Sequence, residues 1–214
     1  MAFRPHLFPV SAPALLPLLA ALCTCTACGL IDDAREEQSR YEYIVFSDKP
    51  FETYCLETWD LNGDGRISRY EAQRVRSIDC SGRGITSLFE IGEFENLESL
   101  DCSRNEIVTL DVSSLARLTE LDCSQNRLTR LDLGQLRGLV RLDCAENELA
   151  SLDPGACTSL SALDGRGNRY PTLDVSGCSQ TLAADLTDNP QLELVYAREG
   201  QNIRAEGATE VIYR

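Results

Sequence analysis

The sequence repeats itself as LDCSRNEIVTL (100–110), LDCSQNRLTRL (121–131) and LDCAENELASL (142–152), three near-copies that begin 21 residues apart. Further copies extend the series as IDCSGRGITSL (78–88), LDGRGNRYPTL (163–173) and a degraded ADLTDNPQLEL (184–194). One unit of this length cannot bury its apolar edge alone, whereas stacked units share one core. The fixed short period therefore predicts a solenoid.

With the leucine that precedes it, each unit fits L-x-x-L-x-C-x-x-N-x-L and resembles a leucine-rich repeat. We expect a short horseshoe, with a parallel β-sheet on the concave side and mostly coil or turns on the convex side, capped by an N-terminal helix-loop-helix. Pro154 lacks a backbone donor and argues against a continuous convex strand there. The expected divisions are a lipoprotein signal peptide (1–27), a tether (28–46), a helical cap (47–77), the repeats (78–194) and a C-terminal cap (195–214).

Because the units stack, residues at the same place in each unit should line up in columns along the stack, and two such columns are polar or sulfur-containing. The asparagines should hydrogen-bond the backbone of neighbouring coils, and they are Asn105, Asn126, Asn147, Asn168 and Asn189. The cysteines should be reduced core residues, because parallel side chains do not aim at one another; they are Cys80, Cys102, Cys123 and Cys144. Whether Cys157 and Cys178 form a disulfide is left open.

The N-terminus has the features of an export signal. A nearly all-apolar run from Leu7 to Leu22 precedes three cysteines and then an acidic stretch. This order resembles the lipobox of bacterial lipoproteins, and Cys28, after Thr26 and Ala27, is the expected lipid anchor. A plain secretory signal with incidental cysteines is the alternative.

The segment DLNGDGRISRYE (60–71) has the spacing of an EF-hand calcium loop. Oxygen ligands for Ca²⁺ are expected from Asp60, Asn62, Asp64, the Arg66 carbonyl, Ser68 (through water) and Glu71. Ser68 and Glu71 also form a capping-box pattern that predicts a short helix to about Val75. An apolar stripe that includes Phe51 and Trp59 predicts a helix before the loop, started by Asp48 and Pro50. A metal-stiffened end cap is favoured over a calcium switch, because the chain has one such loop.

The segments IVFSDKPFETYCLETWDLNGDGRIS and ITSLFEIGEFENLESLDCS, followed by LDCS-x-N coils, are similar to Bacteroidetes-type surface leucine-rich-repeat lipoproteins. These proteins join an EF-hand-like cap to a short solenoid, and the coils also resemble those of internalins, which are bacterial adhesins. The resemblance extends to EGQNIRAEGATEVIYR, which looks like the family's C-terminal cap. It implies a location at the outer membrane or cell surface, and a binding role, without identifying a partner.

The concave face is the expected partner-binding surface. Its constant column contains Asp101, Asp122, Asp143 and Asp164, and its variable column contains Ser99, Glu120 and Arg141. The constant column supplies negative charge that favours a basic protein partner; alternatively, it is a repeat-consensus residue that is hydrogen-bonded and solvated. The variable column could encode specificity.

Composition narrows the function further. The net charge of −14 disfavours nucleic acid and anionic lipid, so membrane contact is expected through the lipid anchor alone. The one histidine, His6, lies in the signal, which leaves no imidazole for catalysis. We therefore expect an adhesion or protein-interaction scaffold and not an enzyme.

Two alternatives to this function are a structural envelope lipoprotein and a carbohydrate-binding protein. The second is less favoured, because aromatic side chains on which a sugar could stack are missing from the concave face. Neither the partner nor the oligomeric state follows from the sequence.

Overall fold

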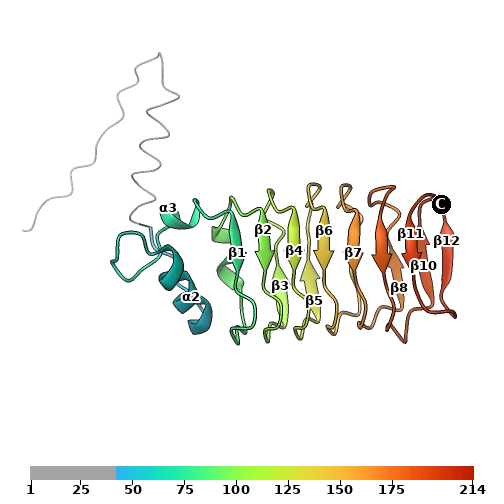
Figure 1. Cartoon of the computed structure of the whole chain (residues 1–214), viewed down its shortest axis with the longest axis horizontal. Helices are drawn as coiled ribbons and strands as arrows, with labels where there is room; N and C mark the ends of the chain where they lie inside the picture. Colours follow the sequence, from blue (N-terminus) through green and yellow to red (C-terminus); the bar gives the residue numbers. More distant parts are fainter. Residues whose placement is uncertain (1–41) are drawn as a thin grey trace, which may run out of the picture.

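The chain winds into a stack of coils along one long axis, with a small helical cap at the N-terminal end (Figure 1). The structure is a computed structural model that describes residues 42–214. The signal peptide, Cys28 and most of the tether thus lie outside the described residues. None of the helices within residues 42–214 has the length and hydrophobicity that a membrane span requires.

Each coil contributes one short strand to a seven-stranded parallel sheet of order β1-β2-β4-β6-β7-β9-β11. The strands are β1 (Ser77–Asp79), β2 (Ser99–Asp101), β4 (Glu120–Asp122), β6 (Arg141–Asp143), β7 (Ala162–Asp164), β9 (Ala183–Asp185) and β11 (Asn202–Arg204). Equivalent residues of successive coils pair directly, for example Leu100 with Leu121 and Leu121 with Leu142. The 21-residue period therefore sets the register, as predicted.

The core is formed by the apolar residues of each coil, which meet inside the stack. The four column cysteines are fully buried, and Leu100, Leu121 and Leu142 are at most 2% exposed. Gly165 interrupts the cysteine column, and the buried ring of Tyr170 lies 3.5 Å from where a Cβ at Gly165 would be. The cysteine column is thus continued by an aromatic ring instead of leaving a void.

The predicted asparagine ladder is present and joins successive coils. Asn126 Nδ2 donates to the carbonyls of Cys102 in the preceding coil and of Cys123 in its own, at 3.0 and 3.1 Å. Its Oδ1 accepts from the backbone N–H of Ile107 at 3.0 Å. Asn105, Asn147 and Asn168 make the equivalent contacts. Each amide thereby satisfies buried backbone groups of two coils.

The opposite side of the stack, called here the back face, carries more strand than the sequence predicts. Two small parallel sheets form there, because equivalent back segments also stack in register. They contain β3 (Thr109–Asp111) with β5 (Arg130–Asp132), and β8 (Thr172–Asp174) with β10 (Leu194–Ala197) and β12 (Glu210–Tyr213). The coil between them contains Pro154 and has no back strand, as expected from its missing donor.

The N-terminal cap packs on the first coil through an aromatic cluster and one carboxylate. Helix α2 (Lys49–Trp59) begins at the N-cap Asp48, as predicted, and α3 (Arg69–Ala72) begins at Ser68 with the predicted capping box, although it ends before Val75. The rings of Phe51 and Trp59 lie 6.0 and 5.8 Å from the Phe94 ring of the first coil. The cap therefore closes the open end of the core.

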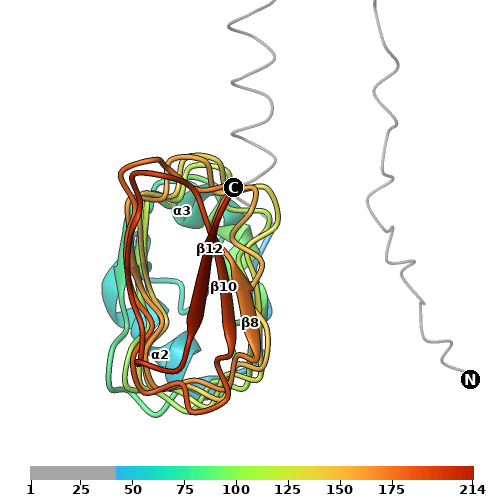
Figure 2. The same cartoon turned by 90° about the vertical axis from the view of Figure 1, so that its right-hand side faces the viewer.

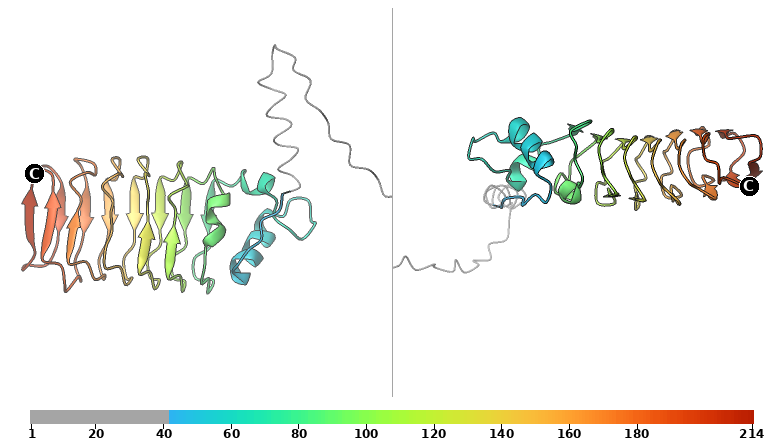
Figure 3. Two further views of the ribbon diagram at one scale, coloured as in Figure 1. Left: turned by 180° about the vertical axis from the view of Figure 1, so that it is seen from behind. Right: turned by 90° about the horizontal axis from the view of Figure 1, so that it is seen from below.

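The C-terminal segment forms one more coil. Its strand β11 extends the main sheet by pairing with β9, and β12 extends the back sheet by pairing with β10. Figure 2 shows this last coil superposed on the outline of those behind it. The stack runs nearly straight in both views of Figure 3, which gives the seven-stranded sheet a long, open outer surface, called here the sheet face.

Candidate functional site

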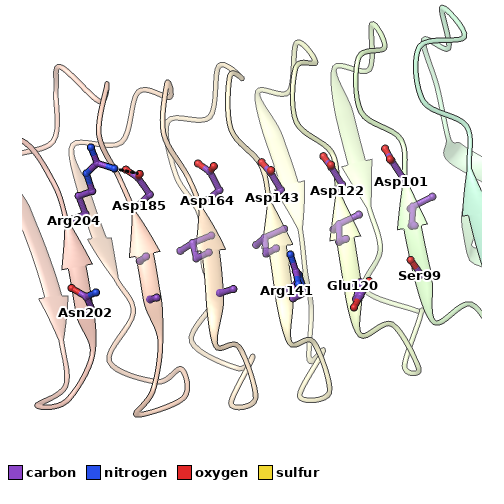
Figure 4. Close-up of a pocket in the computed structure, with 17 residues that line it drawn as sticks. Ser99, Asp101, Glu120, Asp122, Arg141, Asp143, Asp164, Asp185, Asn202 and Arg204 are labelled. Carbon is purple, nitrogen blue, oxygen red and sulfur yellow. Dashed lines mark hydrogen bonds and ion pairs between the residues drawn. The ribbon is translucent and has the colours of Figure 1, made fainter.

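The sheet face is lined by the aspartates that end its strands (Figure 4). In each case Oδ1 accepts a hydrogen bond from the backbone N–H two residues later, which turns the chain off the strand. For Asp101 and Asp122 the donors are Ser103 and Ser124, at 2.9 and 3.0 Å. The same contact recurs at Asp79, Asp143, Asp164 and Asp185. One oxygen of each aspartate therefore serves the fold.

The back face shows that this role is structural. Asp111, Asp132, Asp153 and Asp174 end the back segments with the same contact to the N–H two residues later. An aspartate column with one function on both faces does not by itself mark a binding surface. The sheet face has three such residues in consecutive coils whose second oxygen is unused: Oδ2 of Asp101, Asp122 and Asp143 has no hydrogen-bond or ion-pair partner within residues 42–214. On the back face, Asp132 and Asp174 are ion-paired with Arg130 and Arg214.

The pKa values of the column aspartates shift in different directions along the sheet face. Burial, together with the neighbouring carboxylates of Asp122 and Asp164, raises the pKa of Asp143 above its ordinary value, against the effect of its backbone hydrogen bond. At the C-terminal end the pKa of Asp185 is lowered: burial opposes the charge, but hydrogen bonds from Thr187 and the nearby Arg204 outweigh it. A positive charge placed beside Asp143, in the middle of the face, would therefore stabilise the charged form of its carboxylate.

A shallow pocket of about 770 Å³ lies over the sheet face. All seven residues predicted to bind a partner line it: Ser99, Asp101, Glu120, Asp122, Arg141, Asp143 and Asp164. Across the strands the variable column reads Ser99, Glu120, Arg141, Ala162, Ala183 and Asn202. Arg141 is exposed and forms no ion pair with any residue of the described chain. The alanines leave a hollow between Arg141 and Asn202.

Asn202 and Arg204 complete the pocket, and sequence reasoning missed both. They lie in the segment expected to be a C-terminal cap, which lacks the L-D-C motif. The one available signal was Ile203, which occupies the leucine position of β11. Arg204 takes the place of the column aspartate and its Nη1 lies 3.1 Å from Asp185 Oδ2, so the acidic column ends in an ion pair.

The predicted calcium loop lies between α2 and α3 and is built around Asp60. Its carboxylate accepts from the backbone N–H groups of Gly63, Asp64 and Gly65, at 2.9, 3.1 and 2.9 Å. Gly65 has a φ of +77°, which favours glycine at this turn. Glu71 joins the two ends of the loop, because Oε1 accepts from Leu61 N and Oε2 from Ser68 N, both at 2.9 Å.

The donor set fits calcium in chemistry and order, with three carboxylates, one amide and one carbonyl within twelve residues. The side chains are turned toward backbone amides instead of a common centre, however. Within residues 42–214 no three His, Cys, Asp or Glu side chains converge closely enough to hold a metal ion. Calcium binding would therefore require Glu71 to turn from the Ser68 N–H toward the loop.

Comparison with known proteins agrees with this architecture. Residues 96–118 and 117–139 match a family model described as Leucine Rich Repeat. The fold is a leucine-rich-repeat solenoid. No curated protein sequence matches the chain.

Among solved structures, the functional domain of InlJ from Listeria monocytogenes, which includes a cysteine ladder, is 21% identical with a TM-score of 0.49; the match covers 76% of this chain and 60% of that one. Internalin C2 of the same organism is 17% identical with a TM-score of 0.47, over 79% and 94%. The Toll–Spatzle complex of Drosophila is 18% identical with a TM-score of 0.44, over 63% and 26%. This chain thus spans less than two thirds of the InlJ structure. At sequence identities this low, the similarity to these structures concerns the fold alone.

The repeat cysteines are core residues without the features of nucleophiles. All seven cysteines of the described chain are free and buried, including Cys157 and Cys178. Burial raises the pKa of Cys144 to about 12 and that of Cys102 and Cys123 well above the ordinary thiol value. A thiol that stays protonated is a poor nucleophile and a poor metal ligand.

Proposed function

We propose that this protein is an exported scaffold that binds a protein partner on the sheet face of its leucine-rich repeats and performs no catalysis. The observation that carries the proposal is the pocket of about 770 Å³ over that face, where a variable column crosses a fixed frame of aspartates. An open sheet of this kind offers no enclosed site in which the pKa of a catalytic group could be tuned.

The partner surface that fits is basic. Unpaired oxygens of Asp101, Asp122 and Asp143 line one edge of the pocket, and the chain carries a net charge of −14. Burial and, to a smaller extent, the neighbouring carboxylates raise the pKa of Asp143, and lysine or arginine side chains of a partner would stabilise its charged form. An acidic partner, nucleic acid included, would meet like charge at this face.

The site and its chemistry are tested by photocrosslinking in the native host. Three variants each carry one photoreactive residue, in place of Glu120 or Arg141 on the sheet face or of Thr172 on the back face as the matched control. All three positions are exposed residues in strands. We expect the same crosslinked partner from 120 and 141 and none from 172. Binding of that partner should weaken about tenfold or more between about 0.05 and 0.5 M salt. Equal crosslinking from both faces, or binding that is independent of salt, would contradict the proposal.

Calcium binding to residues 60–71 is part of the same proposal, as a metal-stiffened end cap. A single extracellular loop binds at roughly 0.1–1 mM. At about 1 mM calcium, mass action gives about 0.5–1.5 kcal/mol, or a rise in melting temperature of about 1–6 °C. Melting curves in calcium and in chelator measure this. Asp60→Ala and Glu71→Gln should abolish the shift, and the second keeps one oxygen for the Ser68 cap. Identical melting with and without calcium in the unaltered protein would exclude a stabilising metal.

We further propose that Cys28 is lipidated and that the lipid is the sole membrane contact, which places the repeats at the outer membrane or cell surface. Cys28→Ser should release the protein into the soluble envelope or culture fraction, as fractionation and immunoblotting would show. A Cys23→Ser variant is the control and should remain membrane-bound. Release of both variants, or of neither, would contradict anchoring at Cys28.

The alternative is a structural envelope lipoprotein whose calcium loop and acidic face serve stability alone. One observation favours it: the aspartates of both faces make the same turn-forming hydrogen bond, so the column needs no ligand to account for it. Absence of any crosslinked partner at positions 120 and 141, in calcium and in host extracts, supports this alternative over the binding scaffold.

A further inference from the structure

A second pocket, of about 380 Å³, lies on the back face and is lined by residues of the first three coils. It is formed where the turn η1 (Phe89–Glu93) replaces the back strand of the first coil and lies beside β3. Figure 3, left, shows η1 in green next to the back strands. The pocket belongs to the opposite face from the proposed partner surface.

Phe89 lies on the rim of this pocket and is 87% exposed, the largest exposed fraction among the large apolar side chains of the described chain. The turn that carries Phe89 is held by hydrogen bonds. Phe89 N donates to Ser87 Oγ at 3.3 Å, and Glu90 accepts from both the N–H and the hydroxyl of Ser47 at 3.0 and 3.2 Å. Ile91, on the other side of the turn, is buried in the core. The ring therefore projects from a turn that is anchored on both sides.

Polar groups of β3 and β5 form the rest of the pocket. Asp111 and Asp132 pair in register, as do Thr109 and Arg130. Arg130 Nη2 lies 3.0 Å from Asp132 Oδ2. Hydrogen bonds from Ser113 lower the pKa of Asp111 below its ordinary value, so that it is charged at neutral pH.

Gly92 lets η1 lie close to this wall. A Cβ on Gly92 would lie 2.9 Å from Ser114 Oγ, so a larger residue would force the Ser114 side chain or the turn to shift. Glycine at this position keeps the ring of Phe89 and the polar groups of β3 around one pocket, since Gly92 and Ser114 both line it.

These groups specify a ligand class. Carboxylates accept hydrogen bonds from hydroxyl donors, and the Arg130 N–H groups that Asp132 does not use can donate to an oxygen acceptor. A hydroxyl group of a ligand can take either part. Two carboxylates beside one arginine disfavour an anionic ligand. The exposed ring offers an apolar platform for the C–H face of a flat, polyhydroxylated ring. We propose that this back-face pocket binds a neutral sugar residue of a glycan, stacked on Phe89 and hydrogen-bonded by Asp111, Arg130 and Asp132.

The proposal is independent of the sheet face and of calcium. Its test uses the full-length protein in mild detergent on an array of neutral and acidic oligosaccharides containing glucose, galactose, mannose or N-acetylglucosamine. We expect binding to a subset of neutral glycans, followed by titration calorimetry with the best of them. Phe89→Ala should lower that affinity about tenfold or more, and Phe89→Trp should retain it.

Matched variants separate binding from folding. Phe89 is exposed, so Phe89→Ala should melt at the unaltered temperature. Leu61→Ala removes a 68% exposed apolar side chain of the cap, far from the pocket, and should bind normally. Asp111→Asn keeps an oxygen for the Ser113 N–H and should weaken binding. An array without neutral-glycan signal, or a signal unchanged by Phe89→Ala, would overturn the proposal.

Discussion

Replacing Asn126 by alanine should lower the free energy of unfolding by about 2–4 kcal/mol, because it leaves the buried Ile107 N–H without a partner, at a cost of about 1–3 kcal/mol, and removes one of the two asparagine donors to each of the Cys102 and Cys123 carbonyls. The amide of Asn126 satisfies the Ile107 N–H and the carbonyls of Cys102 and Cys123. Those groups belong to two adjacent coils and are closed off from water by the stack. The melting temperature should fall by about 10 °C.

Calorimetry or urea unfolding measures the effect. Arg127→Ala, at the next residue, is the matched control: its side chain is 64% exposed and pairs with Glu106 at 3.3 Å. A surface pair of this kind contributes less than about 1 kcal/mol. If Asn126→Ala and Arg127→Ala destabilise the protein equally, the ladder does not hold the coils together.

Replacing Asp48 by alanine should destabilise the protein by about 3 kcal/mol, because one buried carboxylate joins the cap to the first coil. Its Oδ1 accepts from the Phe51 N–H at 2.9 Å and so caps helix α2. Its Oδ2 accepts from the N–H and hydroxyl of Thr86 at 2.9 and 2.8 Å. Unfolding followed by fluorescence of Trp59, whose ring lies 5.8 Å from that of Phe94, reports on this junction directly.

The effect of Asp48 should depend on pH. Burial opposes its charge, but the hydrogen bonds from Thr86, Phe51 and Ser87 outweigh burial and lower its pKa below the ordinary 3.8. A carboxylate with a lowered folded pKa stabilises above the unfolded pKa and loses that contribution as the pH falls through the folded pKa. The stability difference between the unaltered protein and Asp48→Asn should therefore be full at neutral pH and shrink below pH 3.8. A difference that is constant across this range would contradict the assignment.

Most of the solenoid could be predicted because its determinants recur. The leucine, cysteine and asparagine columns each repeat at one spacing, and the structure places Asn126 and Cys123 where the period requires. The seven predicted residues of the sheet face also line one pocket, because strand pairing in register fixes which side chains are neighbours.

Features that occur once could not be predicted in this way. The turn η1 replaces a back strand in the first coil, and FEIGE has no counterpart in the other units. The strand β11 lacks the L-D-C motif and forms because the preceding coil offers an unpaired edge to Ile203. Glu71 was predicted both to close the capping box and to bind calcium, although one carboxylate serves both roles; the structure shows it in the capping box.

The stacked arrangement is tested most directly by counting reactive thiols. Within residues 42–214 all seven cysteines are buried and free, and burial raises the pKa of those in the repeats. A form of the protein that begins at Glu42 carries these seven cysteines without Cys23, Cys25 and Cys28. We predict no rapid reaction with an aromatic disulfide reagent in the native state and reaction of all seven cysteines after unfolding in guanidinium without reductant. Rapid native modification of Cys102, Cys123 or Cys144, or fewer than seven reactive thiols after unfolding, would contradict a shared dry interior of reduced cysteines.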